Sequence, residues 1–138
     1  IYGLDILARL QPGETVLIHA AAGGVGQAAL QVARRRGARV FATASQAKQA
    51  ALLEQGVEAV FDSRTTGFAE QILQATDGRG VDVVLNSLKG EWVEASFRCL
   101  ARGGRFVELG KIEIWSRQQA AERRPDARYL PFVACLSC

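Results

Sequence analysis

Several residue types and patterns that define common protein classes are scarce in this 138-residue chain. No apolar run approaches the length that crosses a bilayer, and no signal peptide opens the sequence, so we expect a cytoplasmic protein without membrane contact. The cysteines Cys99, Cys135 and Cys138 are odd in number and poorly spread for a disulfide framework. The last two form C-x-x-C, but no second pair or histidine set completes a zinc site.

Groups that commonly perform catalysis are equally few. The chain contains no nucleophile elbow, no P-loop lysine after its glycines and no metal-ligand cluster. Its single histidine, His19, has no acid or nucleophile at motif spacing, so we interpret it as a hydrogen-bonded structural residue rather than a base. The chemistry is therefore expected to come largely from a bound cofactor, without a metal.

The charge balance gives little indication of a charged macromolecular partner. The net charge is only +3, and the one tight basic cluster, residues 34–36, comes just before Gly37, where a helix should end. Cations at that place complement the helix dipole, so we interpret the cluster as a solvated helix end. Basic and aromatic residues do not alternate as they would on a nucleic-acid surface, and no nucleic-acid partner is expected.

Strand-like and helix-like segments alternate along the chain. Helical spacing of apolar residues over 1–10 predicts a short leading helix. Strands are then expected at 15–19, 39–43, 59–61, 81–85, 105–109 and 128–132, and helices at 24–36, 46–55, 68–75, 91–100 and after Trp115, with a turn at Gly103-Gly104. This alternation predicts an α/β fold, a Rossmann-like doubly wound, mostly parallel sheet of about six strands with helices on both faces.

The first strand-to-helix turn is the most informative segment. Ala21, Gly23 and Gly26 occupy the three positions of a G-x-G-x-x-G fingerprint, with alanine in place of the first glycine. Small residues let the backbone approach a ligand, and the following helix directs its N–H groups and positive dipole end at it. The pattern predicts a pyrophosphate site, with a plain tight turn as the alternative. Its expected cofactor-binding residues are Ala22, Gly23, Gly24, Val25 and Gly26.

The ends of the second and third strands favour NADPH over NADH. A site selective for NAD normally places an acid after the second strand, but this chain has Thr43, Ser45 and Lys48 there. A hydroxyl and a lysine suit a 2′-phosphate, and Arg64, after the third strand, is placed to reach the same group. The alternatives are that Ser45 only caps the next helix and that Lys48 and Arg64 are ordinary surface cations.

Two further strand ends are expected to line the nicotinamide side of the groove. They carry Asn86-Ser87-Leu88 and Leu109-Gly110-Lys111. Lys111 is a candidate catalytic residue because a lysine there can donate a proton or stabilise an anionic oxygen, although a surface lysine fits equally well. Ser87 fits a helix cap as well as a site residue, and Asp82, inside the strand, is expected to face a solvated edge or a hydrogen-bonding partner.

Three segments carry a family resemblance: GETVLIHAAAGGVGQAA (13–29), GRGVDVVLNSLKGE (78–91) and GGRFVELGK (103–111). Through them nearly the whole chain resembles the cofactor-binding portion of the enoyl reductase domain of modular polyketide synthases. That domain belongs to the zinc-independent part of the medium-chain dehydrogenase/reductase superfamily. Fatty acid synthase enoyl reductases and quinone oxidoreductases are relatives there, and the last two segments favour the synthase enzymes.

The resemblance implies NADPH-dependent reduction of an α,β-unsaturated acyl thioester held on an acyl carrier protein, beside other synthase domains, in polyketide or fatty acid biosynthesis. It matches Ser45, Lys48 and Arg64 to 2′-phosphate contacts and Lys111 to a proton-donating lysine. It divides the chain into a connecting helix (1–12), an NADP-binding Rossmann domain (13–132) and a divergent tail (133–138).

Two departures from the family bear on activity. The aspartate that the family pairs with the lysine aligns with Val133, and the sequence lacks the GroES-like substrate domain. The isolated chain is therefore expected to bind cofactor but to turn over poorly or not at all. The alternatives are a fragment of an NADPH-dependent quinone or alkenal reductase, and a non-catalytic nucleotide-binding module.

Overall fold

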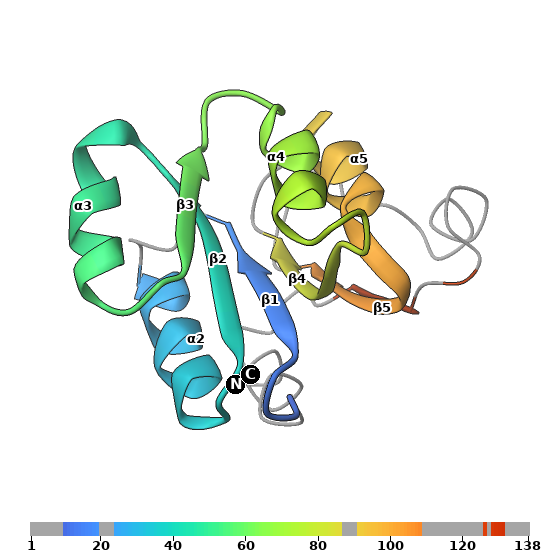
Figure 1. Cartoon of the computed structure of the whole chain (residues 1–138), viewed down its shortest axis with the longest axis horizontal. Helices are drawn as coiled ribbons and strands as arrows, with labels where there is room; N and C mark the ends of the chain where they lie inside the picture. Colours follow the sequence, from blue (N-terminus) through green and yellow to red (C-terminus); the bar gives the residue numbers. More distant parts are fainter. Residues whose placement is uncertain (1–9, 20–23, 87–90, 109–125, 127, 132–138) are drawn as a thin grey trace.

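The computed structural model describes residues 10–19, 24–86, 91–108, 126 and 128–131 (Figure 1). Strands and helices alternate as the sequence predicts. The elements are β1 (Thr15–Ile18), α2 (Gly24–Arg35), β2 (Arg39–Ala44), α3 (Gln46–Glu54), β3 (Ala59–Asp62), α4 (Phe68–Ala75), β4 (Val81–Asn86), α5 (Glu91–Arg98), β5 (Leu100–Glu108) and β6 (Arg128–Pro131). The helices predicted for residues 1–10 and after Trp115 fall outside the described residues, apart from Leu10.

The six described strands form one sheet in the order β3-β2-β1-β4-β5-β6, and every neighbouring pair is parallel. The chain first proceeds outward from β1 to β3 and then returns to the other side of β1 at β4. This reversal is the topological switch point at which ligands of open α/β sheets bind. The predicted Rossmann-like, doubly wound architecture is confirmed, with a sheet that is parallel throughout the described strands.

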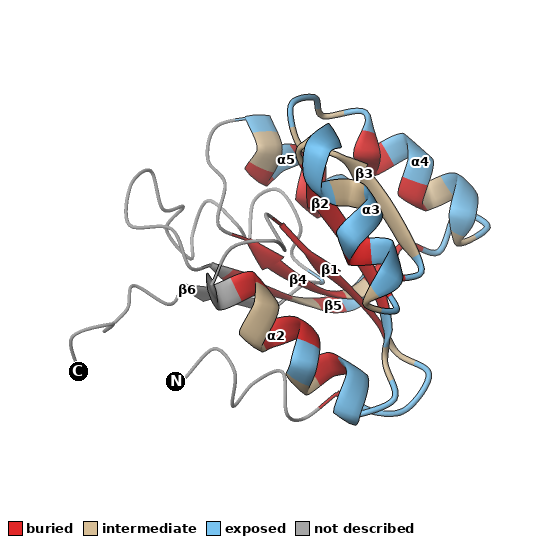
Figure 2. Ribbon diagram, turned by 90° about the vertical axis from the view of Figure 1, so that its left-hand side faces the viewer, coloured by how far each residue is buried: buried red, intermediate tan, exposed pale blue. Residues whose placement is uncertain are grey.

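Helices cover both faces of the sheet (Figures 1 and 2). Side chains alternate across a strand, so β1 directs Val16 and Ile18 to one face and Leu17 to the other. The first face packs against α2 and α3, and the second against α4 and α5, where Phe97 and Phe106 stack with ring centroids 4.2 Å apart. Burial on both faces explains why β1 is an unbroken apolar run after Thr15.

The start of β5 differs from the prediction. Leu100 already pairs with Val81, and the next pair joins Arg105 to Val83, so five residue steps on β5 oppose two on β4. The expected Gly103-Gly104 turn is therefore a bulge within a strand that begins at Leu100, and α5 ends at Arg98. The strand begins before the glycines because β4 pairs with the segment directly after α5: the Val81 N–H donates to the Cys99 carbonyl at 2.8 Å.

Asp82 was expected to face either a solvated edge or a hydrogen-bonding partner, and the structure shows hydrogen-bonding partners. Its Oδ2 accepts the Thr15 backbone N–H at 2.9 Å, and its Oδ1 accepts a bond from the Arg79 guanidinium at 2.8 Å. The carboxylate therefore joins β4 to the beginning of β1 at the edge opposite the strand ends. No helix among the described residues is long and apolar enough to cross a bilayer.

Candidate functional site

The predicted binding residues that the structure describes lie at or next to the carboxyl edge of the sheet. Helix α2 begins at Gly24, as predicted, directly after the glycine turn, and Gly26 is buried in its first turn. That turn contains no acidic residue, so the positive dipole end of α2 is not offset by a carboxylate of its own. Ala22 and Gly23 lie outside the described residues, as do the side chains at positions 24 and 25, and the pyrophosphate site stays a prediction.

A cavity of about 540 Å³ lies where β2 and β3 end. The described residues that line it are Ser45, Gln46, Ala47 and Arg64. The register of the two parallel strands produces this arrangement, since Ala44 of β2 lies opposite Asp62 of β3 and the Ser63 N–H donates to the Ala44 carbonyl at 3.2 Å. Ser45 and Arg64, predicted from different strand ends, therefore share one wall.

Ser45 is the N-cap residue of α3, with an extended backbone, but its hydroxyl makes no capping hydrogen bond. The capping alternative is therefore not how the structure uses this side chain. The third predicted residue, Lys48, is exposed in the first turn of α3 and does not line the described part of the cavity. Thr43 is fully buried, with its hydroxyl turned into the protein.

Arg64 extends from a turn that Asp62 stabilises. The Asp62 Oδ1 accepts the Arg64 backbone N–H at 2.9 Å, whereas the Arg64 Nε is 3.7 Å from the same oxygen. The Arg64 side chain is 70% exposed, so this ion pair is loose and strongly screened by solvent. A planar guanidinium with five donors that makes one weak contact can bind a phosphate.

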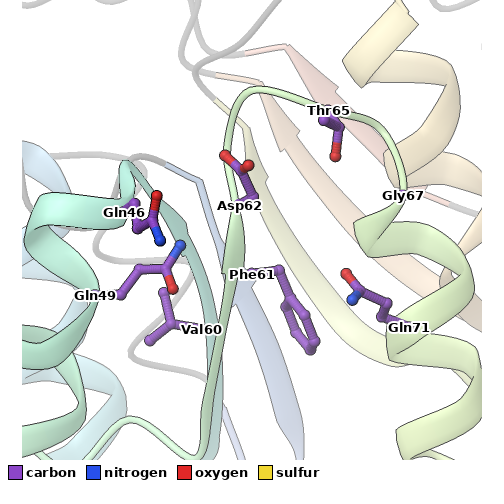
Figure 3. Close-up of a pocket in the computed structure, with 8 residues that line it drawn as sticks. All are labelled: Gln46, Gln49, Val60, Phe61, Asp62, Thr65, Gly67 and Gln71. Atoms are coloured by element: carbon purple, nitrogen blue, oxygen red, sulfur yellow. The ribbon is translucent and has the colours of Figure 1, made fainter.

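A second cavity, of about 560 Å³, surrounds β3 between α3 and α4 (Figure 3). Figure 3 shows Val60 and Phe61 on opposite sides of the strand. Amides and hydroxyls dominate the polar part of its lining, and Asp62 is the one ionisable group among the described lining residues. Because those residues supply no cation, an anionic group is better matched by the cavity beside Arg64. The described lining is Gln46, Gln49, Val60, Phe61, Asp62, Thr65, Gly67 and Gln71.

His19 is buried at the end of β1 with both ring nitrogens in hydrogen bonds. Nδ1 lies 2.9 Å from the Thr43 Oγ1, and Nε2 lies 2.7 Å from the Ser96 Oγ. The ring also makes an edge contact with Phe68, with centroids 5.0 Å apart. Burial lowers the pKa of His19 to about 3, so the imidazole is neutral at physiological pH. The interpretation of His19 as a hydrogen-bonded structural residue is confirmed.

This burial predicts an acid sensitivity. The pKa of His19 falls from 6.5 in the unfolded chain to about 3 in the fold, so its contribution to stability is complete above pH 6.5 and is lost as the pH falls toward 3. Within that window the free energy of unfolding should fall by about 1.4 kcal/mol per pH unit on account of this residue. We expect the free energy of unfolding, measured with urea from pH 4.5 to 6.5, to rise more steeply with pH in the native protein than in His19→Gln. An equal dependence on pH in the two proteins would contradict a neutral buried imidazole.

The nicotinamide side of the groove is described only in part. Asn86 is buried at the end of β4, whereas Ser87, Leu88, Leu109, Gly110, Lys111 and Val133 lie outside the described residues. Their assigned roles stay predictions. Within the part of the chain that the structure describes, no group of three histidine, cysteine or acidic residues is arranged to hold a metal ion. Cys99 is a buried thiol whose Sγ–H donates to the Ser96 carbonyl at 3.4 Å.

Comparison with known proteins identifies the family. The sequence profile described as zinc-binding dehydrogenase matches residues 24–124, well over half of the chain. The chain belongs to this family. Among solved structures, it is similar to the nucleotide-binding subdomain of the enoyl reductase domain of PpsC from Mycobacterium tuberculosis, with 46% identity and a TM-score of 0.85 over 99% of this chain and 78% of that one. It also resembles the CurK enoyl reductase, with 57% identity and a TM-score of 0.92, over 95% of this chain and 40% of that one.

Similar protein sequences also belong to polyketide synthases. The chain is 51% identical over 134 residues to the phenolphthiocerol synthesis polyketide synthase type I Pks15/1 of Mycobacterium marinum, a match that covers 96% of this chain and 6% of the synthase. The chain thus spans a small fraction of the large synthases that it matches. Together the matches confirm the expected relationship: the chain corresponds to the nucleotide-binding subdomain of polyketide synthase enoyl reductases, and the family of dehydrogenases implies a nicotinamide cofactor.

Proposed function

We propose that this chain binds NADPH and forms the cofactor-binding part of an enoyl reductase that acts within a cytoplasmic polyketide synthase. The observation that carries the proposal is the cavity beside Ser45 and Arg64, which offers a hydroxyl that makes no capping hydrogen bond and a loosely paired guanidinium at the edge where α2 begins. NADH has a bare ribose hydroxyl at the position where NADPH carries a phosphate. An acid that would bind that hydroxyl is missing directly after β2, and the Arg64 cation follows β3. Both features favour NADPH.

The residues present fit such a cofactor in two places. The N–H groups at the start of α2 suit the pyrophosphate because they are unpaired within the helix and lie at its positive dipole end. Ser45 and Arg64 suit the 2′-phosphate, and Lys48, exposed one turn away, adds positive charge nearby. The bound cofactor supplies the hydride. A substrate domain built from chain outside residues 13–132 would complete the enzyme.

For the full enzyme we propose reduction of an α,β-unsaturated acyl thioester carried by an acyl carrier protein. The family resemblance assigns the protonation of the substrate to Lys111, and we assign Asn86, the last residue of β4, to the nicotinamide side. The relatives at about half identity are synthases and synthase enoyl reductases, which supports a thioester over the quinone or alkenal alternative.

Calorimetric titration of the chain with NADPH and with NADH tests the cofactor. We expect saturable binding of both, with NADPH at least tenfold tighter, and binding of 2′,5′-ADP as a probe of the phosphate contact alone. Equal affinities for the two dinucleotides would contradict the 2′-phosphate assignment. The absence of saturable binding by either would leave only a structural role for the chain. In the parent synthase, a crotonyl thioester should be reduced and a quinone should not.

A further inference from the structure

We propose that His19 is a positioning residue that holds Ser45 and Arg64 at the separation a 2′-phosphate needs, and thereby sets the preference for NADPH over NADH. The inference rests on the proposed function of the cavity beside these two residues. His19 is not among the described residues that line the cavity, and it acts through hydrogen bonds in the interior of the fold.

One of the two hydrogen bonds of His19 leads toward Ser45. The Thr43 hydroxyl bonds the His19 Nδ1 from β2, two residues before Ser45. Thr43 also pairs with Phe61 of β3 in the sheet register, so its position affects both strands that end at the cavity. The bond therefore fixes the carboxyl end of β2 to the carboxyl end of β1.

The other hydrogen bond of His19 leads, through α5, toward Arg64. The His19 Nε2 bonds the Ser96 Oγ of α5, and that hydroxyl lies 2.7 Å from the Trp92 carbonyl, one turn earlier in the helix. The Trp92 indole N–H then donates to the Ser63 carbonyl at 3.1 Å, and Ser63 directly precedes Arg64. Four hydrogen bonds, linked through the His19 ring, the Ser96 hydroxyl and Trp92, thus connect Thr43 of β2 to Ser63, which follows β3.

The direction of these bonds is fixed. The Ser96 hydroxyl has one proton, which it donates to the Trp92 carbonyl, so the Ser96 Oγ accepts a proton from the His19 Nε2. Nε2–H is then the donor of the neutral ring, Nδ1 is the acceptor, and the Thr43 hydroxyl donates to it. A low pKa keeps the ring in this neutral form, with a single tautomer satisfied on both sides.

An apolar side chain would fill this site without specifying geometry. The ring is enclosed by the α4 and α5 side of the core, next to Phe68, and a buried imidazole is stable there only with both nitrogens bonded. A satisfied polar network fixes one arrangement of the elements it joins. Only NADPH places a group between Ser45 and Arg64, so a change in their separation should alter NADPH binding more than NADH binding.

The test compares the two dissociation constants in variants of the whole chain. His19→Leu, which removes both bonds, should weaken NADPH binding five- to twentyfold and NADH binding less than twofold. Ser96→Ala should act in the same direction, and the double variant should be no worse than His19→Leu, since both belong to one network. His19→Gln, whose amide can donate to Ser96, should recover part of the NADPH affinity. Phe68→Leu is the matched control, because it loosens packing against the ring without removing a hydrogen bond.

Two results would overturn the inference: a ratio of NADPH to NADH affinity that stays at the native value in both His19→Leu and Ser96→Ala, or an equal loss for both cofactors in both. Either would mean that His19 serves stability alone. The Phe68→Leu control should lower the Tm and leave the ratio of the two affinities at the native value. If His19→Leu does not fold, Ser96→Ala, which retains the imidazole, decides the question. A native protein that already binds both cofactors equally would instead overturn the proposed function, so the two failures are distinguishable.

Discussion

Replacing Arg64 by alanine should weaken NADPH binding by about tenfold to thirtyfold and leave NADH binding unchanged. A hydrogen bond between a guanidinium and a phosphate contributes roughly 1.5–3 kcal/mol, and the lower half of that range applies because the side chain is 70% exposed. Isothermal titration with both dinucleotides measures the effect. Selectivity should fall as the ionic strength rises in the native protein, because the contact is screened by salt.

Arg98→Ala provides the matched control for this experiment. Arg98 is an exposed arginine in an ion pair with Glu70 at 3.3 Å, in the last turn of α5 and outside the cavity lining. Its removal should change neither affinity. Asp62→Asn adds a second arm, since it keeps an oxygen that can accept the Arg64 N–H and removes the competing charge; NADPH should then bind more tightly. A loss of equal size for NADPH and NADH in Arg64→Ala would show that Arg64 only supports the fold.

Replacing Gly80 by alanine should lower the free energy of unfolding by about 3 kcal/mol or more, enough to prevent folding of a marginal domain. Gly80 has φ +87°, and a Cβ there would lie 2.4 Å from the Cys99 carbonyl oxygen and 3.0 Å from the Ala101 nitrogen. Neither backbone atom can move cheaply, because the Cys99 carbonyl accepts the Val81 N–H that joins β4 to β5.

Gly78→Ala separates the two contributions to this loss of stability, the steric clash of the new Cβ and the cost of the left-handed backbone conformation. Gly78 has nearly the same positive φ, +84°, but a Cβ there meets nothing within 4 Å. Its replacement should cost only the left-handed conformation, about 1–2 kcal/mol. Urea unfolding of the two variants gives the difference, and a gap of less than 1 kcal/mol between them would show that the strand junction can move aside.

Local sequence patterns predicted the elements well because most segments are strongly apolar or clearly bounded. The helix at Phe68–Ala75 has the expected limits, and β1 and β2 end within one residue of the prediction. The early start of β5 could not be predicted in the same way. Gly103-Gly104 is typical of a turn, and only pairing with β4 converts the segment into a bulged strand.

The sequence predicted that Ser45 and Arg64 serve one phosphate, but it did not supply the strand pairing that brings them to one cavity. That pairing is the register of β2 and β3, with Ala44 opposite Asp62. The sequence alone did not show that Lys48, exposed in the first turn of α3, would be missing from the described cavity lining. The sequence likewise identified His19 as structural, while its partners Thr43 and Ser96 come from elements 24 and 77 residues away.

The indole of Trp92 gives the molecule a built-in optical reporter. The chain has two tryptophans, Trp92 and Trp115, so Trp115→Phe leaves a single indole. That ring is half-buried and bonded to the carbonyl immediately before Arg64, and its fluorescence depends on the polarity and the hydrogen bond around it. Occupation of the neighbouring crevice can therefore be followed as a change in emission from the protein itself, with no label attached.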